Sequence, residues 1–324
     1  MLASLLHASF GLTTFATMGP PTEFMTSTAS EGYKLSVRRW SAATKGDQRR
    51  PKATVVLQHG GGWHSGYYDE LGIALSGSGY EVVALDAMGH GYSEGPLRDS
   101  SLNQGVKADQ GQVQTGVTYW TGLLDAQADL RKLCAQEKAE RARPLVVVAE
   151  SIGVLVGVPL AMAPRPRRRG LRERLFGAND PAADADSPPG DAASVDAVVT
   201  TGGCMQIAKE TQPPGIVCFV FEVLGRFIPK RNVILKDLDQ TFDSAFGRDE
   251  WAQAARADPL ISTNSFYLGP ISQQFKGMKR LRNGAGEMRL PLYVMHSKAD
   301  PRTSAEAATK FYEDAGPSLR DAPA

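Results

Sequence analysis

One serine stands where an apolar strand is expected to turn abruptly into a helix. Residues 146–155 read VVVAESIGVL, which places Ser151 at the corner between the small residues Ala149 and Gly153. Such a tight turn holds the serine in strained backbone geometry and lifts its hydroxyl above the sheet edge, the layout of a nucleophile elbow. The usual pattern is Gly-x-Ser-x-Gly, so Ala149 adds one methyl group. Taken alone, the motif also fits an ordinary serine at a helix N-cap.

A glycine-rich turn comes well before this serine. A strand is expected to run into the sequence HGGG at residues 59–62. Backbone N–H groups of such a turn can point at a developing oxyanion without side chains in the way. We therefore predict an oxyanion hole made by the amides of Gly61 and Ile152. A glycine run after a strand is often only a loop, but the blocks HSGYY at 64–68 and DAMGHGYS at 86–93 disfavour that alternative.

These motifs together resemble the monoacylglycerol lipase and lysophospholipase-like branch of the α/β-hydrolases, which includes caffeoylshikimate esterase-like and serine aminopeptidase-like proteins. The resemblance runs from about residue 24 to residue 315 and includes the segments 205–214 and 291–300. It implies a mostly parallel, doubly wound α/β sheet with an inserted helical cap. It also implies a serine ester hydrolase that acts on carboxylic esters of lipids through an acyl-enzyme. An aspartate nucleophile, known on this fold, is excluded by Ser151 at the elbow.

The resemblance places the acid of a catalytic triad at Asp300. This residue follows the expected strand Leu292–Met295 in the sequence HSKAD. A carboxylate at that place orients the imidazole of a triad and stabilises the imidazolium. An aspartate directly before Pro301 can also be an ordinary turn residue.

The general base has no clear position in this chain. In the family the histidine follows the acid, in a loop beyond the last strand, so that it reaches over the serine. No histidine follows His296 in the 324 residues. The five histidines are His7 in the leader, His59 and His90 in the turn motifs, His296 at a strand end, and His64, which we expect to line the substrate pocket.

We therefore expect a C-terminally truncated or re-spliced α/β-hydrolase with little or no activity, because losing a triad histidine costs about a million-fold in turnover. Residues 316–324, GPSLRDAPA, also depart from the family pattern where a last strand should lead to the histidine. Without that strand a sheet edge would be exposed. The alternative is a catalytically silent α/β-hydrolase that binds an apolar ligand or a protein partner.

The composition is that of an ordinary soluble globular protein. With 324 residues, 42% of them apolar and 22% charged, the chain can bury a large core. A net charge of +1 gives no field to attract nucleic acid, so no nucleic-acid partner is expected. The three cysteines lack metal-ligand spacing, and neither a metal nor a cofactor is implied.

Sequence features leave the location open between cytoplasm and a peripheral membrane site. The cysteines lie in or beside apolar stretches, which favours a reducing compartment. Residues 1–22 contain no lysine or arginine and therefore lack the basic region of a secretory signal. The chain has no run of about eighteen apolar residues, so a transmembrane span is not expected.

Short apolar runs predict the strands that must position these residues. They are rich in valine and do not alternate with polar residues, as in parallel strands covered on both faces. The runs are Thr54–Gln58, Glu81–Leu85, residues 145–148, residues 197–200 and Leu292–Met295. Residues 24–27 and 33–40 predict an antiparallel hairpin that leads into the sheet. A long helix is predicted before the serine strand by the apolar stripe Tyr119, Leu123, Ala126, Leu130 and Cys134.

Two segments interrupt the alternation of strands and helices. Residues 164–194 contain six arginines between Arg165 and Arg174, and the rest of the segment is rich in Ala, Asp, Pro and Gly. This composition predicts a disordered surface insertion. Those arginines could contact acidic lipid or a partner, or form a solvated loop. Residues 205–289 predict a helical cap. The predicted plan is a leader at 1–22, core at 23–163, the insertion at 164–194, a core strand at 195–204, the cap at 205–289 and an incomplete core at 290–324.

The cap carries more apolar residues than one packed face needs. Residues 216–228 follow two prolines and are strongly apolar. We expect Phe219 and Phe221 to line the substrate pocket, and the cap could line an acyl channel or rest on a membrane surface. Packing against the core explains part of the run equally well. The sequence does not separate a glyceride from a phenolic ester or a lysophospholipid.

Overall fold

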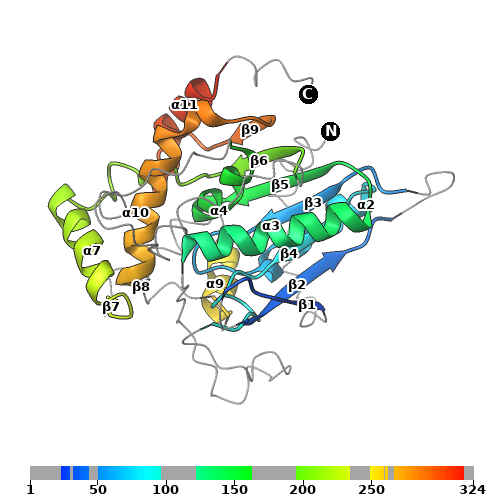
Figure 1. Ribbon diagram of the computed structural model, residues 1–324, viewed down its shortest axis with the longest axis horizontal. Coiled ribbons are helices and arrows are strands. Elements are labelled where there is room, and N and C mark those ends of the chain that lie inside the picture. Colours follow the sequence, from blue (N-terminus) through cyan, green and yellow to red (C-terminus); the bar gives the residue numbers. More distant parts are fainter. Residues whose placement is uncertain are drawn as a thin grey trace, which may run out of the picture.

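The computed structural model describes residues 23–29, 32–43, 50–95, 122–162, 195–233, 249–258, 260–261 and 266–316. In these residues seven strands form one sheet in the order β1-β2-β4-β3-β5-β6-β9 (Figure 1). The strands are β1 (Glu23–Thr26), β2 (Lys34–Trp40), β3 (Thr54–Gln58), β4 (Glu81–Leu85), β5 (Leu145–Glu150), β6 (Ala197–Thr201) and β9 (Leu292–Met295). Strands β4, β3, β5, β6 and β9 are parallel, whereas β1 and β2 form an antiparallel hairpin joined to β4.

The predicted strands are confirmed with small differences at their ends. β3, β4 and β9 have the predicted bounds, and β6 extends one residue further, to Thr201. β5 extends two residues further, to Glu150, because its pairing with β6 continues to the pair Glu150 and Thr201. The strand therefore runs without a gap into Ser151.

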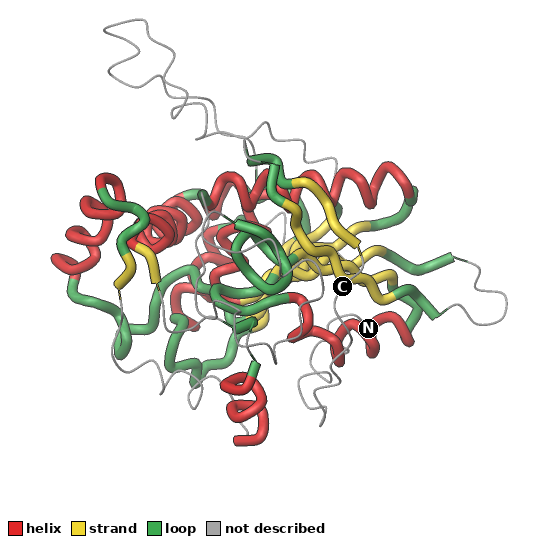
Figure 2. The backbone as a smooth tube through the Cα atoms, turned by 90° about the horizontal axis from the view of Figure 1, so that it is seen from below, coloured by secondary structure: helices red, strands yellow, loops and turns green. Residues whose placement is uncertain are grey.

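Helices cover both faces of the sheet, as a doubly wound fold requires. On one face Val56 and Val83 pack in the same apolar cluster as Leu130, which belongs to α3 (Leu123–Glu140). On the other face Val55 and Val82, their direct neighbours, pack with residues of α2 (Asp69–Gly77). Successive strand side chains point to opposite faces, so valine-rich strands fill both layers. Figure 2 shows the strands between these helical layers.

The long helix predicted before the serine strand is α3. Leu123, Ala126, Leu130 and Cys134 of the predicted stripe are buried. Tyr119, the first member, lies outside the described residues. α3 packs on the face that also holds α4 (Val154–Gly157), the helix after the serine.

Further helices and two short strands lie between β6 and β9. They are α7 (Gly215–Phe227), β7 (Asn232–Val233), α9 (Asp249–Ala257), β8 (Phe266–Tyr267) and α10 (Leu268–Asn283). α7 lies against α10 (Figure 1), so closely that a Cβ on Gly225 would come within 2.5 Å of the Leu268 carbonyl oxygen. α10 also reaches the main core, where Met278 and Leu281 are buried. The predicted limits of the cap stay a prediction, and the predicted leader and insertion lie outside the described residues.

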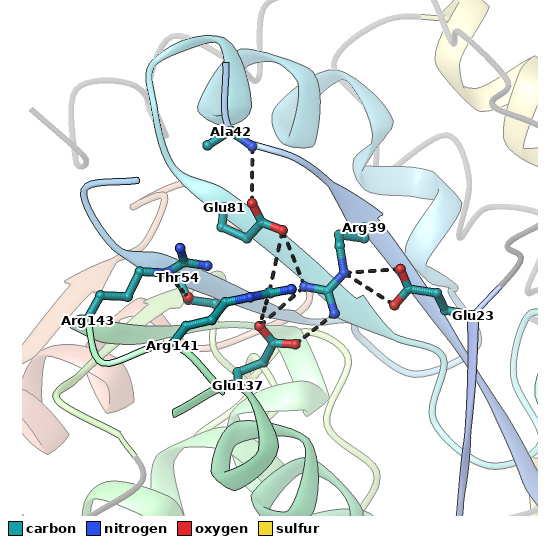
Figure 3. Close-up of polar contacts among 8 residues, drawn as sticks. All are labelled: Glu23, Arg39, Ala42, Thr54, Glu81, Glu137, Arg141 and Arg143. Carbon is teal, nitrogen blue, oxygen red and sulfur yellow. Dashed lines mark hydrogen bonds and ion pairs between the residues drawn. The ribbon is translucent and has the colours of Figure 1, made fainter. Parts of the chain in front are cut away.

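A network of charged side chains ties together the sheet end where β4 begins (Figure 3). Arg39 of β2 contacts Glu23, Glu81 and Glu137, with 2.7 Å between its Nη2 and Glu137 Oε1. Arg141 reaches the other Glu137 oxygen at 2.6 Å. Glu137 lies near the end of α3 and its side chain is only 3% exposed. The network lies at the amino ends of the parallel strands, whereas Ser151 follows the carboxyl end of β5, so it serves the scaffold.

Candidate active site

Ser151 has a strained backbone. Its φ is +50°, and it is the one non-glycine residue with a positive φ in the described part of the chain. β5 ends at Glu150, one 3-10 turn follows (Ser151–Gly153), and α4 begins at Val154. A non-glycine residue in this region costs free energy and persists where the surroundings fix it, most often at functional sites. The predicted strained turn at the serine is thus confirmed.

Tight packing explains the small residues around Ser151. A Cβ on Gly153 would lie 2.6 Å from the His59 carbonyl oxygen, so no side chain fits there. Ala149 is fully buried, and its methyl group faces Gly157 of α4, where an added Cβ would lie 2.9 Å from it. The extra methyl of the Ala-x-Ser-x-Gly pattern is therefore accommodated by a glycine in the next helix.

The glycine turn lies against the serine, as the oxyanion-hole prediction requires. A Cβ on Gly60 would lie 3.0 Å from the Ser151 Cβ and 3.6 Å from its Oγ. A Cβ on Gly61 would lie 3.2 Å from Ile152 Cδ1. The structure thus brings the turn and the first residues after the elbow into contact, and the bare glycines leave the space beside the hydroxyl open.

His59 connects the two turn motifs. Its Nε2 accepts a hydrogen bond from the Ala87 backbone N–H at 2.9 Å, so its Nδ1, 2.7 Å from the Gly60 carbonyl oxygen, carries the proton. Burial lowers the pKa of His59, which keeps the ring neutral. Its ring also lies 4.9 Å from the ring of His90. The His59 ring thus joins the two turns in which the sequence places His59 and His90.

Asp86 fixes the loop that follows the glycine turn. Its two carboxylate oxygens accept hydrogen bonds from the backbone N–H of Ser65 at 2.6 Å and of Tyr92 at 2.9 Å. Burial acts to raise the pKa of Asp86, but the nearby His64 and His59 and these backbone bonds lower it overall. The ionised carboxylate is a rigid support below the turn.

His64 points its Nε2 toward α9. The nitrogen lies 2.9 Å from Asp258 Oδ2, while Nδ1 accepts from the Gly66 backbone N–H at 3.2 Å. Burial acts to raise the pKa of Asp258, but the hydrogen bonds from His64 and from the Leu260 backbone N–H lower it overall. His64 is buried and both nitrogens are engaged, so it links the turn to the end of α9. Whether it also lines the substrate pocket stays a prediction.

Asp300 lies at the same end of the sheet, just after β9. One oxygen accepts from the backbone N–H of Arg302 at 2.8 Å and of Thr303 at 3.0 Å; the other accepts from Thr303 Oγ1 at 2.6 Å. His296 Nε2 lies 3.4 Å from the second oxygen. Burial acts to raise the pKa of Asp300, yet the hydrogen bonds from His296 and Thr303 hold it far below its usual range.

The turn after β6 connects Asp300 to the serine. The Thr303 hydroxyl lies 3.2 Å from the carbonyl oxygen of Gly202, which has a φ of +52°. Two residues further on, the Cys204 backbone N–H donates to the Ser151 carbonyl oxygen at 2.9 Å. The three strand ends that carry Ser151, Gly202 and Asp300 are thus joined directly.

The aromatic residues predicted to line the substrate pocket lie on α7. Phe219 is 62% exposed, and Phe221 is half-buried. Their contact with a substrate stays a prediction.

The structure adds three residues to the site that the sequence did not single out. Tyr68 donates a hydrogen bond to Glu150, the residue before the serine, and Asp258 pairs with His64. Tyr68 and Glu150 belong to the motifs already quoted, but no pattern linked them. No sequence pattern pointed to Asp258, because its partner His64 lies 194 positions away in the chain.

Comparisons with known proteins show which family this chain resembles. The family model described as serine aminopeptidase, S33, matches residues 49–171 and 186–321. Mouse monoglyceride lipase is 41% identical over 66 residues, which are 20% of this chain and 20% of that protein. The matched stretch thus spans about a fifth of the length of this relative, and human monoglyceride lipase matches to the same extent.

Solved structures share the fold at low sequence identity. A soluble variant of monoglyceride lipase from Saccharomyces cerevisiae, in complex with a substrate analog, has a TM-score of 0.63 at 16% identity and covers 93% of this chain and 84% of its own. Monoacylglycerol lipase from Paleococcus ferrophilus has a TM-score of 0.59 at 20% identity, covering 86% and 84%. Because the family model matches most of the chain, the protein belongs to the serine aminopeptidase S33 family, in the monoglyceride lipase-like branch of the α/β-hydrolases.

Proposed function

We propose that this protein is a serine ester hydrolase for lipid esters with Ser151 as its nucleophile. The observation that carries the proposal is the positive φ of Ser151 at the corner between β5 and α4. That strain has a mechanistic use, since it presents the hydroxyl beside the glycine turn. Family membership and the names of the relatives support ester hydrolysis.

The roles of the other residues follow from acyl transfer. Ser151 Oγ attacks the ester carbonyl carbon, and the carbonyl oxygen takes the negative charge. The amides of Gly61 and Ile152 donate to that oxyanion. The alcohol leaves with a proton, and water then attacks the acyl-enzyme and releases the acid. Asp300 is the acid that would orient a protonated imidazole.

We expect the Ser151 proton to lack a ready base among the described residues. His59 and His64 have both ring nitrogens engaged, and His296 Nε2 contacts Thr303 and Asp300. An unassisted serine hydroxyl is a poor nucleophile, so we expect turnover about a million-fold below that of a complete triad.

A second candidate is a catalytically silent binding protein of the same fold. It is favoured by the contacts of Asp300, whose carboxylate accepts hydrogen bonds from Arg302 and Thr303 and lies beside His296. The carboxylate of Asp300 is thus already hydrogen-bonded by residues of its own loop. An apolar ligand or a protein partner would then be held through the cap.

The surface of α7 supports a peripheral contact with lipid. Large apolar side chains are exposed along the helix: Ile216, Phe219, Val220, Val223, Leu224, Phe227 and Ile228. Gly225, the buried residue of the helix, marks the side that packs on α10. An apolar face of this size can enter the boundary of a bilayer. No helix among the described residues has the length and apolarity to cross a membrane.

Hydrolysis of a monoacylglycerol, with and without added imidazole, tests the proposed function. We expect slow release of fatty acid, absent in Ser151→Ala, and an acceleration by imidazole, because the free base can take the Ser151 proton. Activity that persists in Ser151→Ala would contradict the proposed nucleophile. If no fatty acid is released with or without imidazole, the second candidate, a binding protein, is favoured. Binding of a tritiated or fluorescent fatty acid to the chain would then test that candidate.

A further inference from the structure

A carboxyl group lies directly before the proposed nucleophile. Glu150 is the last residue of β5, one position after Ala149, whose methyl packs in the α3 layer. Strand side chains alternate, so Glu150 faces the layer of α2. There the Tyr68 hydroxyl donates a hydrogen bond to Glu150 Oε2. Burial raises the pKa of Glu150, so this placement is costly for a carboxylate.

Tyr68 connects this carboxyl group to the glycine turn. The residue is buried at the end of the short turn Ser65–Tyr68 and belongs to the α2-side cluster. Burial raises the pKa of Tyr68 far above its usual value, and the Glu150 carboxyl group adds to that rise. The Tyr68 hydroxyl thus joins the segment that follows the glycine turn to Glu150 on the strand.

Gly60 is itself the glycine that faces Ser151, with 3.0 Å between its added Cβ position and the Ser151 Cβ. The elbow and the turn segment therefore meet at two places: Gly60 lies beside Ser151, and Tyr68, which follows the turn, donates its hydrogen bond to Glu150. An apolar residue at position 150 would be cheaper to bury but could not accept the hydrogen bond of Tyr68.

We propose that Tyr68 and Glu150 are positioning residues, which hold the turn of Gly60 and Gly61 at a fixed distance from Ser151 through the hydroxyl–carboxyl bridge. The inference rests on the proposed serine hydrolase function of that site. An oxyanion hole works only when its donors are already in place, and removing one donor costs about 100-fold to 1,000-fold. Loss of the bridge would let the turn relax but would not remove a donor. The rate should therefore fall by less than it does when a donor is removed.

Two measurements on the full chain test the bridge. The first is hydrogen exchange of the backbone amides of residues 59–64 by mass spectrometry. The second is the rate at which a fluorophosphonate probe labels Ser151, measured against probe concentration to separate the maximal rate from probe affinity. For Tyr68→Phe and Glu150→Ala we expect about tenfold faster exchange in this segment and about tenfold lower maximal labelling rate, with probe affinity unchanged.

Glu150→Gln is the rescue variant, because its amide oxygen can still accept the Tyr68 hydroxyl proton. We expect it to stay within about twofold of the natural chain in both measurements. Tyr80→Phe is the matched control, since Tyr80 is buried in the same cluster and carries no contact to the elbow. It should change neither exchange at residues 59–64 nor labelling.

The bridge is refuted if Tyr68→Phe leaves exchange and labelling unchanged, or if Glu150→Gln is as damaging as Glu150→Ala. If the probe does not label Ser151 in the natural chain, the proposed function itself is contradicted. Exchange at residues 59–64 is measured without the probe, so the two failures are distinguishable.

Discussion

Ala149 gives the elbow of this chain one methyl group more than the usual Gly-x-Ser-x-Gly turn, and Gly157 makes the room for it. The two residues face each other between β5 and α4, with 2.9 Å between the Ala149 Cβ and a Cβ placed on Gly157. The sequence showed the departure at Ala149 but not its compensation. Only the packing of the helix on the strand reveals that the two positions are coupled.

This coupling predicts a double-mutant effect. Gly157→Ala should lower the free energy of unfolding by about 1–3 kcal/mol, because the added methyl overpacks the contact with Ala149. Adding Ala149→Gly should recover part of the loss, since the space is returned. Urea unfolding of both single variants and the double variant measures the interaction energy. Additive effects would show that the positions are independent.

Asp300 predicts a loss of stability in acid. Its folded-state pKa is lowered, so its contribution is present above the unfolded value of about 4 and is lost as pH falls through the folded pKa. Asp300→Asn should therefore be less stable than the natural chain at pH 7, and the gap should narrow below pH 4. Urea midpoints between pH 7 and pH 3 give the comparison. Asp314→Asn, in an exposed pair with Lys310, is the control and should change little.

Residue types along the chain predicted Ser151 and its strained turn, because a strand, a serine and small flanking residues form one local pattern. The family resemblance, together with the strand before it, pointed to Asp300. The sequence could not predict that Asp300 contacts His296 or that Tyr68 contacts Glu150, because both contacts depend on loop conformation and side-chain rotamers. The pairing of His64 with Asp258 joins segments whose separation in sequence carries no periodic signal.

At the scale of elements, α7 is the helix whose exposed apolar face most needs a partner. We predict that Phe219→Ser combined with Phe227→Ser lowers binding to lipid vesicles at least about tenfold, because two exposed rings would lose burial in the bilayer boundary. Cosedimentation with neutral phospholipid vesicles measures the change. Ile73→Ser, which removes an exposed apolar side chain from α2, is the matched control. Equal loss in the control would show that α7 has no special contact.

The charged network at the other end of the sheet predicts a large stability effect without a site effect. Glu137→Ala should destabilise the fold by about 3 kcal/mol or more, because Arg39 and Arg141 would lose a partner that is almost fully buried. Thermal and urea unfolding measure the loss. The probe-labelling rate of the fraction that stays folded should not change. A variant with natural stability would contradict the role of this network.

At the scale of the whole molecule, the strands and the doubly wound class were predictable, because valine-rich runs that do not alternate need cover on both faces. The order β1-β2-β4-β3-β5-β6-β9 was not, since it depends on crossovers that leave no local mark. The exposed face of α7 was predicted from its excess of apolar residues. The packing of α10 into the main core was not predicted, because it lies within a segment expected to form a cap.

The site lies at the carboxyl ends of β5, β6 and β9. It combines Ser151, whose backbone is strained, with Asp300, whose carboxylate is already hydrogen-bonded within its own loop. We propose that the elbow presents the Ser151 hydroxyl but that no described histidine activates it, so the hydroxyl reacts slowly.

The rate of fluorophosphonate labelling at Ser151 in the full 324-residue chain tests this claim most directly, with the modified residue identified by peptide mass spectrometry. We predict slow labelling that maps to Ser151, disappears in Ser151→Ala and increases with added imidazole. Labelling complete within minutes and insensitive to imidazole would show that a working base is present, and would contradict this claim.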